Sequence, residues 1–274
     1  KKKRVRLIMC ELCLGDIHMS LTASEDRPYG WRARVGFITP SPAHENNSYE
    51  FYLMAPDGVT IVMTSLGVVL AEGDIAYQRG IDRLEPATEE IMSRRPDSII
   101  QAGVPLIATH GWGFGQQVLD RINNVTTTPA ATDLDSCVEA MGLLGMTQIA
   151  MLTPFDDNMH QLLSQYVSNA GIQVLGAESV LEEVSGGELR GYEVSTMNLG
   201  AVRSRAIELF RNTGGADGVW ITGALMPSVA VVGSLEAELG VPVVSSMQAM
   251  AWKGMRLAGV REPIPGFGQL LELF

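Results

Sequence analysis

Residues 35–47 read VGFITPSPAHENN, and residues 149–161 read IAMLTPFDDNMHQ. Each stretch is an apolar run that ends in Thr-Pro and continues through a polar turn into a helix-like segment. A second pair of similar stretches follows, SIIQAGVP from residue 98 and GVWITGALMP from residue 218. A chain that repeats itself on this scale is expected to form two similar half-units, with a ligand cleft between them.

Short apolar runs alternate with helix-like segments from Arg34 onward, which is typical of βαβ units and a parallel sheet. One helix is predicted near 159–170, where an apolar stripe at helical spacing ends before Gly171. A second helix is predicted from the stripe that begins at Val202. Strands are predicted at 35–39, 59–64, 98–102, 125–128, 148–153, 172–175, 217–222 and 241–245.

Composition is that of a globular protein, with 274 residues, 46% hydrophobic and 19% charged. The formal net charge of −11 argues against nucleic acid or an anionic membrane as a partner. No apolar run approaches the roughly 18–20 residues that span a bilayer. The apolar stretch that follows the basic start is broken by Glu11 and Asp16, so we expect a cytoplasmic protein in which 1–33 form an N-terminal extension.

The three cysteines are Cys10, Cys13 and Cys137. The first two have CxxC spacing, but a zinc site needs two more ligands and only His18 lies nearby. An odd number of cysteines favours reduced thiols. We therefore expect neither a metal site nor a redox site.

Parallel sheets bind ligands at the carboxyl ends of their strands, which places the predicted site in the loops 39–47, 103–111, 153–160 and 222–228. Helices that begin there offer free N–H groups, which suit a carboxylate or a phosphate. The glycine-rich run 111–115, GWGFG, has neither dinucleotide-loop nor P-loop spacing, so it is interpreted as a turn or a flexible loop.

Three histidines in these loops are candidates for proton transfer, because imidazole titrates near neutral pH. They are His44, His160 and His110. The alternative for each is a solvated side chain with no role. Asp156 and Asp157 could form a pair of acid–base carboxylates, but a position just before a helix favours helix capping.

The C-terminal stretches GVPVVSS (240–246), AWKGMRLAG (251–259) and PGFGQL (265–270) resemble the end of arylmalonate decarboxylases. TGALMPS (222–228) is similar to the second active-site motif of maleate cis–trans isomerases. Both families belong to the aspartate/glutamate racemase superfamily. The resemblance covers about residues 34–270 and implies an α/β fold of two flavodoxin-like parallel-sheet halves related by a pseudo-two-fold axis. It also implies that no cofactor is used and that the last segment returns to the first half, giving halves of 34–145 plus 246–274 and of 146–245.

Members of that superfamily use one or two cysteines that face the substrate. The resemblance places those cysteine positions at Gly103 and Gly223, and neither glycine has a side chain to ionise. The decarboxylase's hydroxyl pair falls on Val104-Pro105, and its tyrosine falls on Phe155. The asparagine of the isomerase's first loop falls at Ala43, beside His44. The implied pocket is therefore more apolar than that of its relatives.

The candidate substrate-binding residues are Pro40, Gly103, Val104, Phe155, Arg190, Tyr192, Gly223 and Ala224. The first hypothesis is a cofactor-independent, decarboxylase-type lyase that acts on a small carboxylate. The alternatives are a cis–trans isomerase of an unsaturated diacid and a non-catalytic protein that binds small carboxylates. The missing thiols argue against racemisation by two opposed bases. A homo-oligomer is possible in each case.

Overall fold

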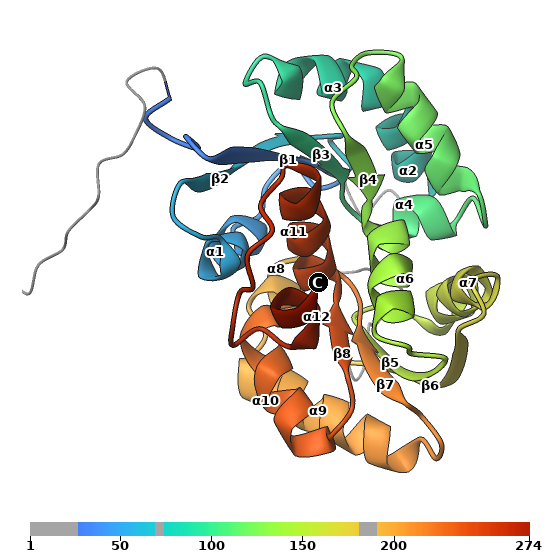
Figure 1. Cartoon of the computed structure of the whole chain (residues 1–274). Helices are drawn as coiled ribbons and strands as arrows, with labels where there is room; N and C mark the ends of the chain where they lie inside the picture. The colour runs from blue at the N-terminus through green and yellow to red at the C-terminus, as the bar shows by residue number, and fades with distance from the viewer. Residues whose placement is uncertain (1–26, 69–73, 181–190) are drawn as a thin grey trace, which may run out of the picture.

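Two four-stranded parallel sheets, each covered by helices, make up the protein (Figure 1). The structure is a computed structural model and describes residues 27–68, 74–180 and 191–274. The first sheet and its connections contain β1 (Ala33–Thr39), α1 (Asn46–Met54), β2 (Val59–Ser65), α2 (Asp74–Asp82), α3 (Leu84–Met92), β3 (Ser98–Gln101), α4 (Val104–Ala108), α5 (Phe114–Asn123), β4 (Ala130–Thr132) and α6 (Asp133–Leu143). The second sheet and the C-terminal segment contain β5 (Gln148–Thr153), α7 (Asp157–Ser168), β6 (Gln173–Ser179), α8 (Gly191–Ser195), α9 (Leu199–Asn212), β7 (Gly218–Ile221), α10 (Val229–Leu239), β8 (Val243–Ser245), α11 (Ser246–Leu257) and α12 (Gln269–Leu273).

The strand order is the same in the two sheets. It is β2-β1-β3-β4 in the first and β6-β5-β7-β8 in the second, with every pair parallel. This order matches the first four strands of the flavodoxin arrangement. The α/β fold of two flavodoxin-like halves that the sequence predicts is confirmed.

Hydrogen bonds at the strand ends repeat between the halves. Thr39 O accepts the N–H of Leu66 at 2.8 Å, and Thr153 O accepts that of Val180 at 2.8 Å. Ile38 O accepts from Ala102, as Leu152 O accepts from Thr222, both at 2.9 Å. Thr39 and Thr153 therefore occupy equivalent positions, as the paired Thr-Pro motifs predict.

Helix α11 follows the last strand of the second sheet but packs against the first sheet and α6 (Figure 1). A capping box between Ser245 and Gln248 starts the helix. Its backbone passes close to the first sheet, where the Ser98 hydroxyl donates to Gly254 O at 2.7 Å. The segment after β8 thus links the two halves, because it leaves the second sheet and packs on the first sheet beside α1 and α6.

The strand predicted at 125–128 is wrong. These residues form a turn after α5, in which the Thr128 N–H donates to the Thr126 hydroxyl. The strand β4 begins only at Ala130, beyond Pro129, whose carbonyl accepts the N–H of Ile99. β-Branched residues raised the strand propensity of the turn, while the residues that pair with β3 are small.

The helix predicted at 159–170 runs over Asp157–Ser168, and its stripe is buried at Met159, Leu163 and Tyr166. The Asp156 carboxylate caps it by accepting the N–H of Met159 at 3.0 Å, which confirms the capping interpretation. Within the described part of the chain, no helix combines the length and apolarity needed to cross a bilayer.

Candidate functional site

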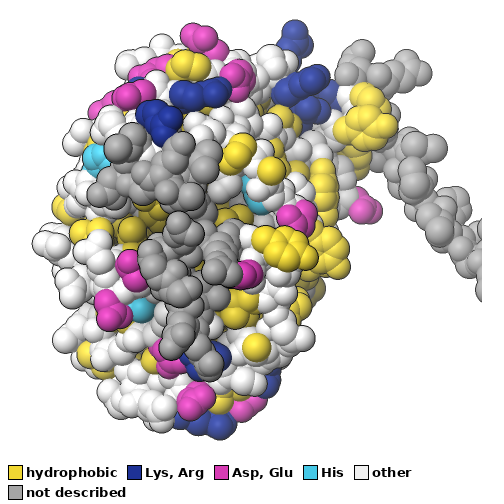
Figure 2. Space-filling view, turned by 180° about the vertical axis from the view of Figure 1, so that it is seen from behind, with side chains coloured by type: hydrophobic (Ala, Val, Ile, Leu, Met, Phe, Trp, Pro, Cys, Tyr) yellow, Lys and Arg dark blue, Asp and Glu magenta, His cyan; other side chains and the backbone are white. Residues whose placement is uncertain are grey.

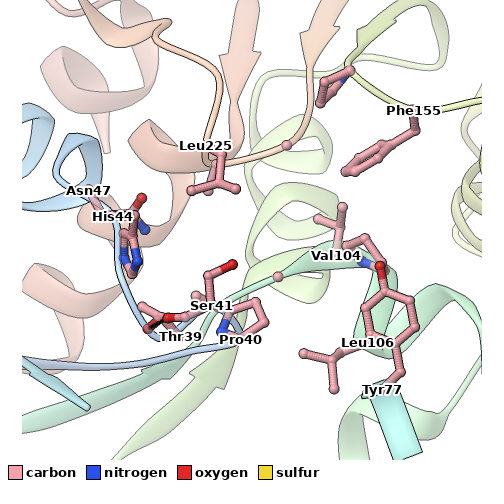
Figure 3. Close-up of a pocket in the computed structure, with 16 residues that line it drawn as sticks. Thr39, Pro40, Ser41, His44, Asn47, Tyr77, Val104, Leu106, Phe155 and Leu225 are labelled. Atoms are coloured by element: carbon pink, nitrogen blue, oxygen red, sulfur yellow. Dashed lines mark hydrogen bonds between the residues drawn. The ribbon is translucent and has the colours of Figure 1, made fainter. Parts of the chain in front are cut away.

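A cleft that is partly open to solvent lies where the carboxyl ends of the two sheets face each other (Figure 3). It is lined by the loops that follow β1, β3, β5 and β7, which are the four loops that the sequence predicts. Predicted residues from the first half that line it are Pro40, His44, Gly103 and Val104. Those from the second half are Phe155, Gly223 and Ala224. The cleft therefore brings together residues from both repeats.

Several lining residues were not singled out from the sequence. They are Thr39, Ser41, Asn47, Tyr77, Ala102, Pro105, Leu106, Pro154 and Leu225. Most belong to the loops already identified, so loop position was a usable signal for them. Tyr77 lies on α2, and no motif marks it.

The two ends of the cleft differ in polarity. His44 and Asn47 lie at one end, and Val104, Leu106 and Phe155 lie at the other (Figure 3). Among the described residues that line the cleft, none is Lys, Arg, Asp or Glu. An anion in this cleft would therefore be held by hydrogen bonds, helix dipoles and His44.

His44 is half-buried, and both of its ring nitrogens are shielded from solvent with no hydrogen-bond partner among the described residues. Burial lowers its pKa below the ordinary value of 6.5, because desolvation disfavours the charged ring. The negative charge of Glu45 and the carbonyl of Ser41 oppose that shift. Ring nitrogens that are shielded from solvent and lack a partner of their own are available to a ligand in the cleft that His44 lines.

His160 lies outside the cleft, in a separate shallow hollow beside β6. Its Nε2 is hydrogen-bonded to the Thr153 hydroxyl at 2.7 Å, and its Nδ1 lies 3.5 Å from the Asp157 carboxylate. Burial lowers its pKa, and the charges of Asp157 and Asp156 act in the opposite direction. This histidine is held by its own half and faces away from the cleft.

His110 also lies outside the cleft. Its ring stacks on Phe114 at a centroid distance of 4.0 Å, and its Nδ1 lies 3.0 Å from the carbonyl of Leu106. It lines a third hollow together with Trp112 and Tyr166. The structure therefore brings only one of the three candidate histidines to the cleft.

Two further predicted binding residues are not in the cleft as described. Tyr192, on α8, is 79% exposed and does not line it. Arg190 lies outside the described residues, as do Cys10 and Cys13.

Gly103 and Gly223 lie in equivalent turns, shortly after β3 and β7 respectively, on either side of the cleft; these two turns are called the corners below. The N–H of Gly103 donates to the Asp133 carboxylate at 3.1 Å, and that of Gly223 donates to the Ser246 hydroxyl at 3.3 Å. Asp133 and Ser246 are the first residues of the equivalent helices α6 and α11. Complete burial raises the pKa of Asp133 to about 6, although its hydrogen bonds partly oppose the shift.

Cys137 lies beneath these corners rather than in the cleft. It is fully buried, and its Sγ lies 3.6 Å from Asp133 and 3.7 Å from the Ser246 hydroxyl. Burial raises the pKa of this thiol, and the Asp133 charge adds to the effect, so it is a poor nucleophile. Across the described ranges, no group of three or more His, Cys, Asp or Glu side chains is placed to hold a metal ion.

Helix α1 ties the first half to the second. The Asn46 amide donates to the carbonyl of Ala224 at 2.8 Å. The Glu50 carboxylate accepts the N–H groups of Ser228 and Val229, at 2.6 and 3.0 Å, and so caps α10. Burial raises the pKa of Glu50 to about 7. The cleft's polar end thus rests on a helix that is fixed to both halves.

Comparison with known proteins agrees with this architecture. The sequence is 24% identical over 208 residues to the arylmalonate decarboxylase of Bordetella bronchiseptica, covering 76% of this chain and 83% of that protein. It is 23% identical over 191 residues to the maleate isomerase of Geobacillus stearothermophilus, covering 67% and 72%.

Solved structures share the fold at low sequence identity. A liganded double mutant of arylmalonate decarboxylase superposes with a TM-score of 0.79 at 19% identity, over 88% of this chain and 99% of that one. A maleate isomerase variant from Pseudomonas putida S16, solved with maleate, gives a TM-score of 0.75 at 21% identity, over 88% and 97%. The sequence profile of the arylmalonate decarboxylase family matches residues 35–271, so the chain belongs to that family.

Proposed function

We propose that the protein is a cofactor-independent lyase of the decarboxylase type, acting on a small carboxylate that carries an apolar substituent. One observation carries the proposal: an unpartnered histidine, His44, faces an apolar wall across a cleft that both halves form. The chain's relatives include a decarboxylase and an isomerase, both enzymes that act on small carboxylates.

The apolar end supplies the environment that decarboxylation needs. A carboxylate beside Val104, Leu106 and Phe155 loses its hydration and gains no charged partner. Carbon dioxide is neutral and apolar, so its formation is favoured where its charged precursor is poorly solvated. An apolar substituent on the same carbon would occupy the remaining space near Tyr77 and Leu225.

The proposed reaction needs only one side chain of the protein, as a proton donor. The bond between the α-carbon and the leaving carboxylate breaks, its electron pair stays on the α-carbon, and carbon dioxide departs. The substrate carries a second carboxylate on the same α-carbon, which is retained and delocalises the pair. Protonated His44 then transfers its N–H proton to the α-carbon and is reprotonated from solvent. With one donor at one end of the cleft, the proton arrives from a single face and sets one configuration.

The competing activity is cis–trans isomerisation. The resemblance to maleate isomerases assigns that chemistry to a nucleophilic thiol, and Gly223 stands at the matching position. The described residues that line the cleft include no cysteine. This composition favours the lyase over the isomerase.

Carbon dioxide release from phenylmalonate, methylmalonate and malonate tests the proposal, with maleate as the isomerase substrate in a parallel assay. Release from phenylmalonate, with one enantiomer of phenylpropionate formed from its α-methyl derivative, is the expected result. Conversion of maleate to fumarate without release of carbon dioxide would overturn it in favour of the isomerase. No turnover of any substrate by folded protein would leave the non-catalytic binding function.

A further inference from the structure

We infer that the start of helix α1, with the Asn47 side chain, is the subsite that binds the retained carboxylate of the substrate. The inference rests on the proposed function in that it assigns one group of the same substrate. It concerns binding, however, and phenylacetate, which has no second carboxylate to lose, tests it without turnover.

Asn47 is a buried residue of the cleft wall rather than a surface residue. It is 3% exposed and lines the cleft, and its Oδ1 has no hydrogen-bond partner among the described residues. Oxygen and nitrogen of an amide are interchangeable by rotation, so the same position can present the NH₂ group to an acceptor. A buried amide oxygen without a partner is destabilising unless a ligand or water completes it.

The helix that carries Asn47 begins without a cap. Glu45 stands at the N-cap position and makes no capping hydrogen bond, and the first turn contains no acidic residue. The first N–H groups of a helix have no intrahelical partner and form the positive end of its dipole. An anion at this point would receive hydrogen bonds that the helix itself leaves unused.

The equivalent helix in the second half is already satisfied. Asp156 caps α7 by accepting the N–H of Met159, and Asp157 adds a negative charge in its first turn. An anion is therefore excluded from the second half's helix start and accepted at the first half's. The two halves of the pseudo-symmetric cleft therefore differ, and an anion is favoured on the side formed by α1.

Two neighbouring groups are compatible with an anion here. His44, which lines the same end of the cleft, is the donor in the proposed reaction and becomes more basic beside a carboxylate. Glu45 is exposed and turned to another hollow, where its carboxylate accepts from the Ser195 hydroxyl at 3.2 Å. Its charge still raises the pKa of His44, but Glu45 does not line the cleft where the anion would bind.

The orientation of the substrate follows from this subsite. With one carboxylate at α1, the other group or groups on the α-carbon extend toward Val104, Leu106 and Phe155. The carboxylate that lies in the apolar end is the one that departs. The chemical class of ligand is therefore a small carboxylate with an apolar arm, held at its charged end by amide and backbone N–H donors.

The experiment compares Asn47→Asp with Asn158→Asp, which changes the same second helical position of α7, where the side chain is exposed. Binding of malonate, phenylacetate and inorganic phosphate to the intact chain is measured by calorimetry. Asp at Asn47 keeps the shape of Asn and suits a helix start, so the fold should persist while the carboxylate is repelled. Malonate and phenylacetate should bind about 10- to 100-fold more weakly to Asn47→Asp, the range of a charge-assisted hydrogen bond, and unchanged to Asn158→Asp.

Unchanged affinity in Asn47→Asp, equal weakening in both variants, or no binding of either carboxylate to the wild type would overturn the inference. Tighter binding of phosphate than of malonate would overturn the carboxylate assignment. Should Asn47→Asp melt early, Asn47→Ala gives the same comparison without the added charge. The two proposals can fail independently. If Asn47→Asp loses carboxylate binding but the wild type releases no carbon dioxide, the subsite stands and the lyase function is wrong. If the wild type releases carbon dioxide and Asn47→Asp does so equally well, the lyase function stands and the subsite is wrong.

Discussion

Gly103 and Gly223 have the same positive φ of +102°, and each lies against the proline that follows the neighbouring strand. A Cβ on Gly103 would lie 2.6 Å from Pro40 Cγ, and one on Gly223 would lie 2.7 Å from Pro154 Cδ. Both corners are thus shaped by the Thr-Pro motif of their own half. The paired Thr-Pro and glycine motifs of the sequence therefore correspond to a turn that occurs once in each half.

Replacement of either glycine by alanine should lower the free energy of unfolding by about 1–3 kcal/mol, because the residue is held at positive φ against a proline ring. Chemical denaturation with urea measures the change. The control is Gly142→Ala, an exposed site inside α6 with open space around a new Cβ, which should be neutral or stabilising by up to about 1 kcal/mol. Equal stability of Gly103→Ala and wild type would contradict the geometry of the corner.

Strand periodicity and the position of loops after strands were enough to predict the two halves and the location of the cleft. Parallel strands must present their carboxyl ends on one edge, so the loops of 39–47 and 153–160 were identifiable without knowledge of packing. Strand propensity alone favours a strand at 125–128, but these residues have no strand to pair with in the part of the chain that the structure describes. Pairing with β3 selected Ala130–Thr132 instead.

The directions of side chains within those loops were not predictable. His44 and His160 are both close to a helix start, yet only His44 lines the cleft. Five residues, 40–44, separate Thr39 from the N-cap Glu45, whereas only two, 154–155, separate Thr153 from the N-cap Asp156. After the shorter loop, His160 is the fourth residue of α7, and the Thr153 hydroxyl holds its ring beside β6 rather than at the cleft. That contact depends on loop length and tertiary packing rather than on residue type.

Replacing His44 with glutamine should reduce kcat for carbon dioxide release by about 10²–10⁴, the usual contribution of a general acid. Glutamine keeps a hydrogen-bonding group of similar length, so KM should change less than kcat. His110→Gln is the matched control, because His110 lies in another hollow and does not line the cleft. A His44 variant as active as the wild type would transfer the proton-donor role away from this residue.

The pH dependence of turnover should also report His44. Its pKa is lowered by burial, and the donor is the protonated ring, so kcat/KM should fall as pH rises, with its basic limb below the ordinary imidazole value of 6.5. A carboxylate bound at α1 stabilises the imidazolium, which should move the corresponding limb of kcat to higher pH. Initial rates across pH 4.5–8.5 at low and at saturating substrate separate the two profiles. A kcat limb at or below that of kcat/KM would argue that no anion lies beside His44.

Glu50 should make the protein less stable as pH rises through neutrality. Its pKa is raised from 4.5 to about 7 by burial, so the folded protein favours the protonated carboxyl more than the unfolded chain does. Stability from this group is therefore complete below about pH 4.5 and is lost as pH rises toward 7.

Glu50→Gln removes this titration while its carbonyl oxygen can still accept the N–H groups of Ser228 and Val229. The free energy of unfolding of the variant, minus that of wild type, should therefore become more positive between pH 5 and pH 8. Urea titrations at both pH values measure the difference, and Glu89→Gln, exposed on α3, should show no such trend. A difference that shrinks with rising pH would mean that the Glu50 carboxylate is stabilised where it caps α10, and that the N–H groups of that helix outweigh its burial.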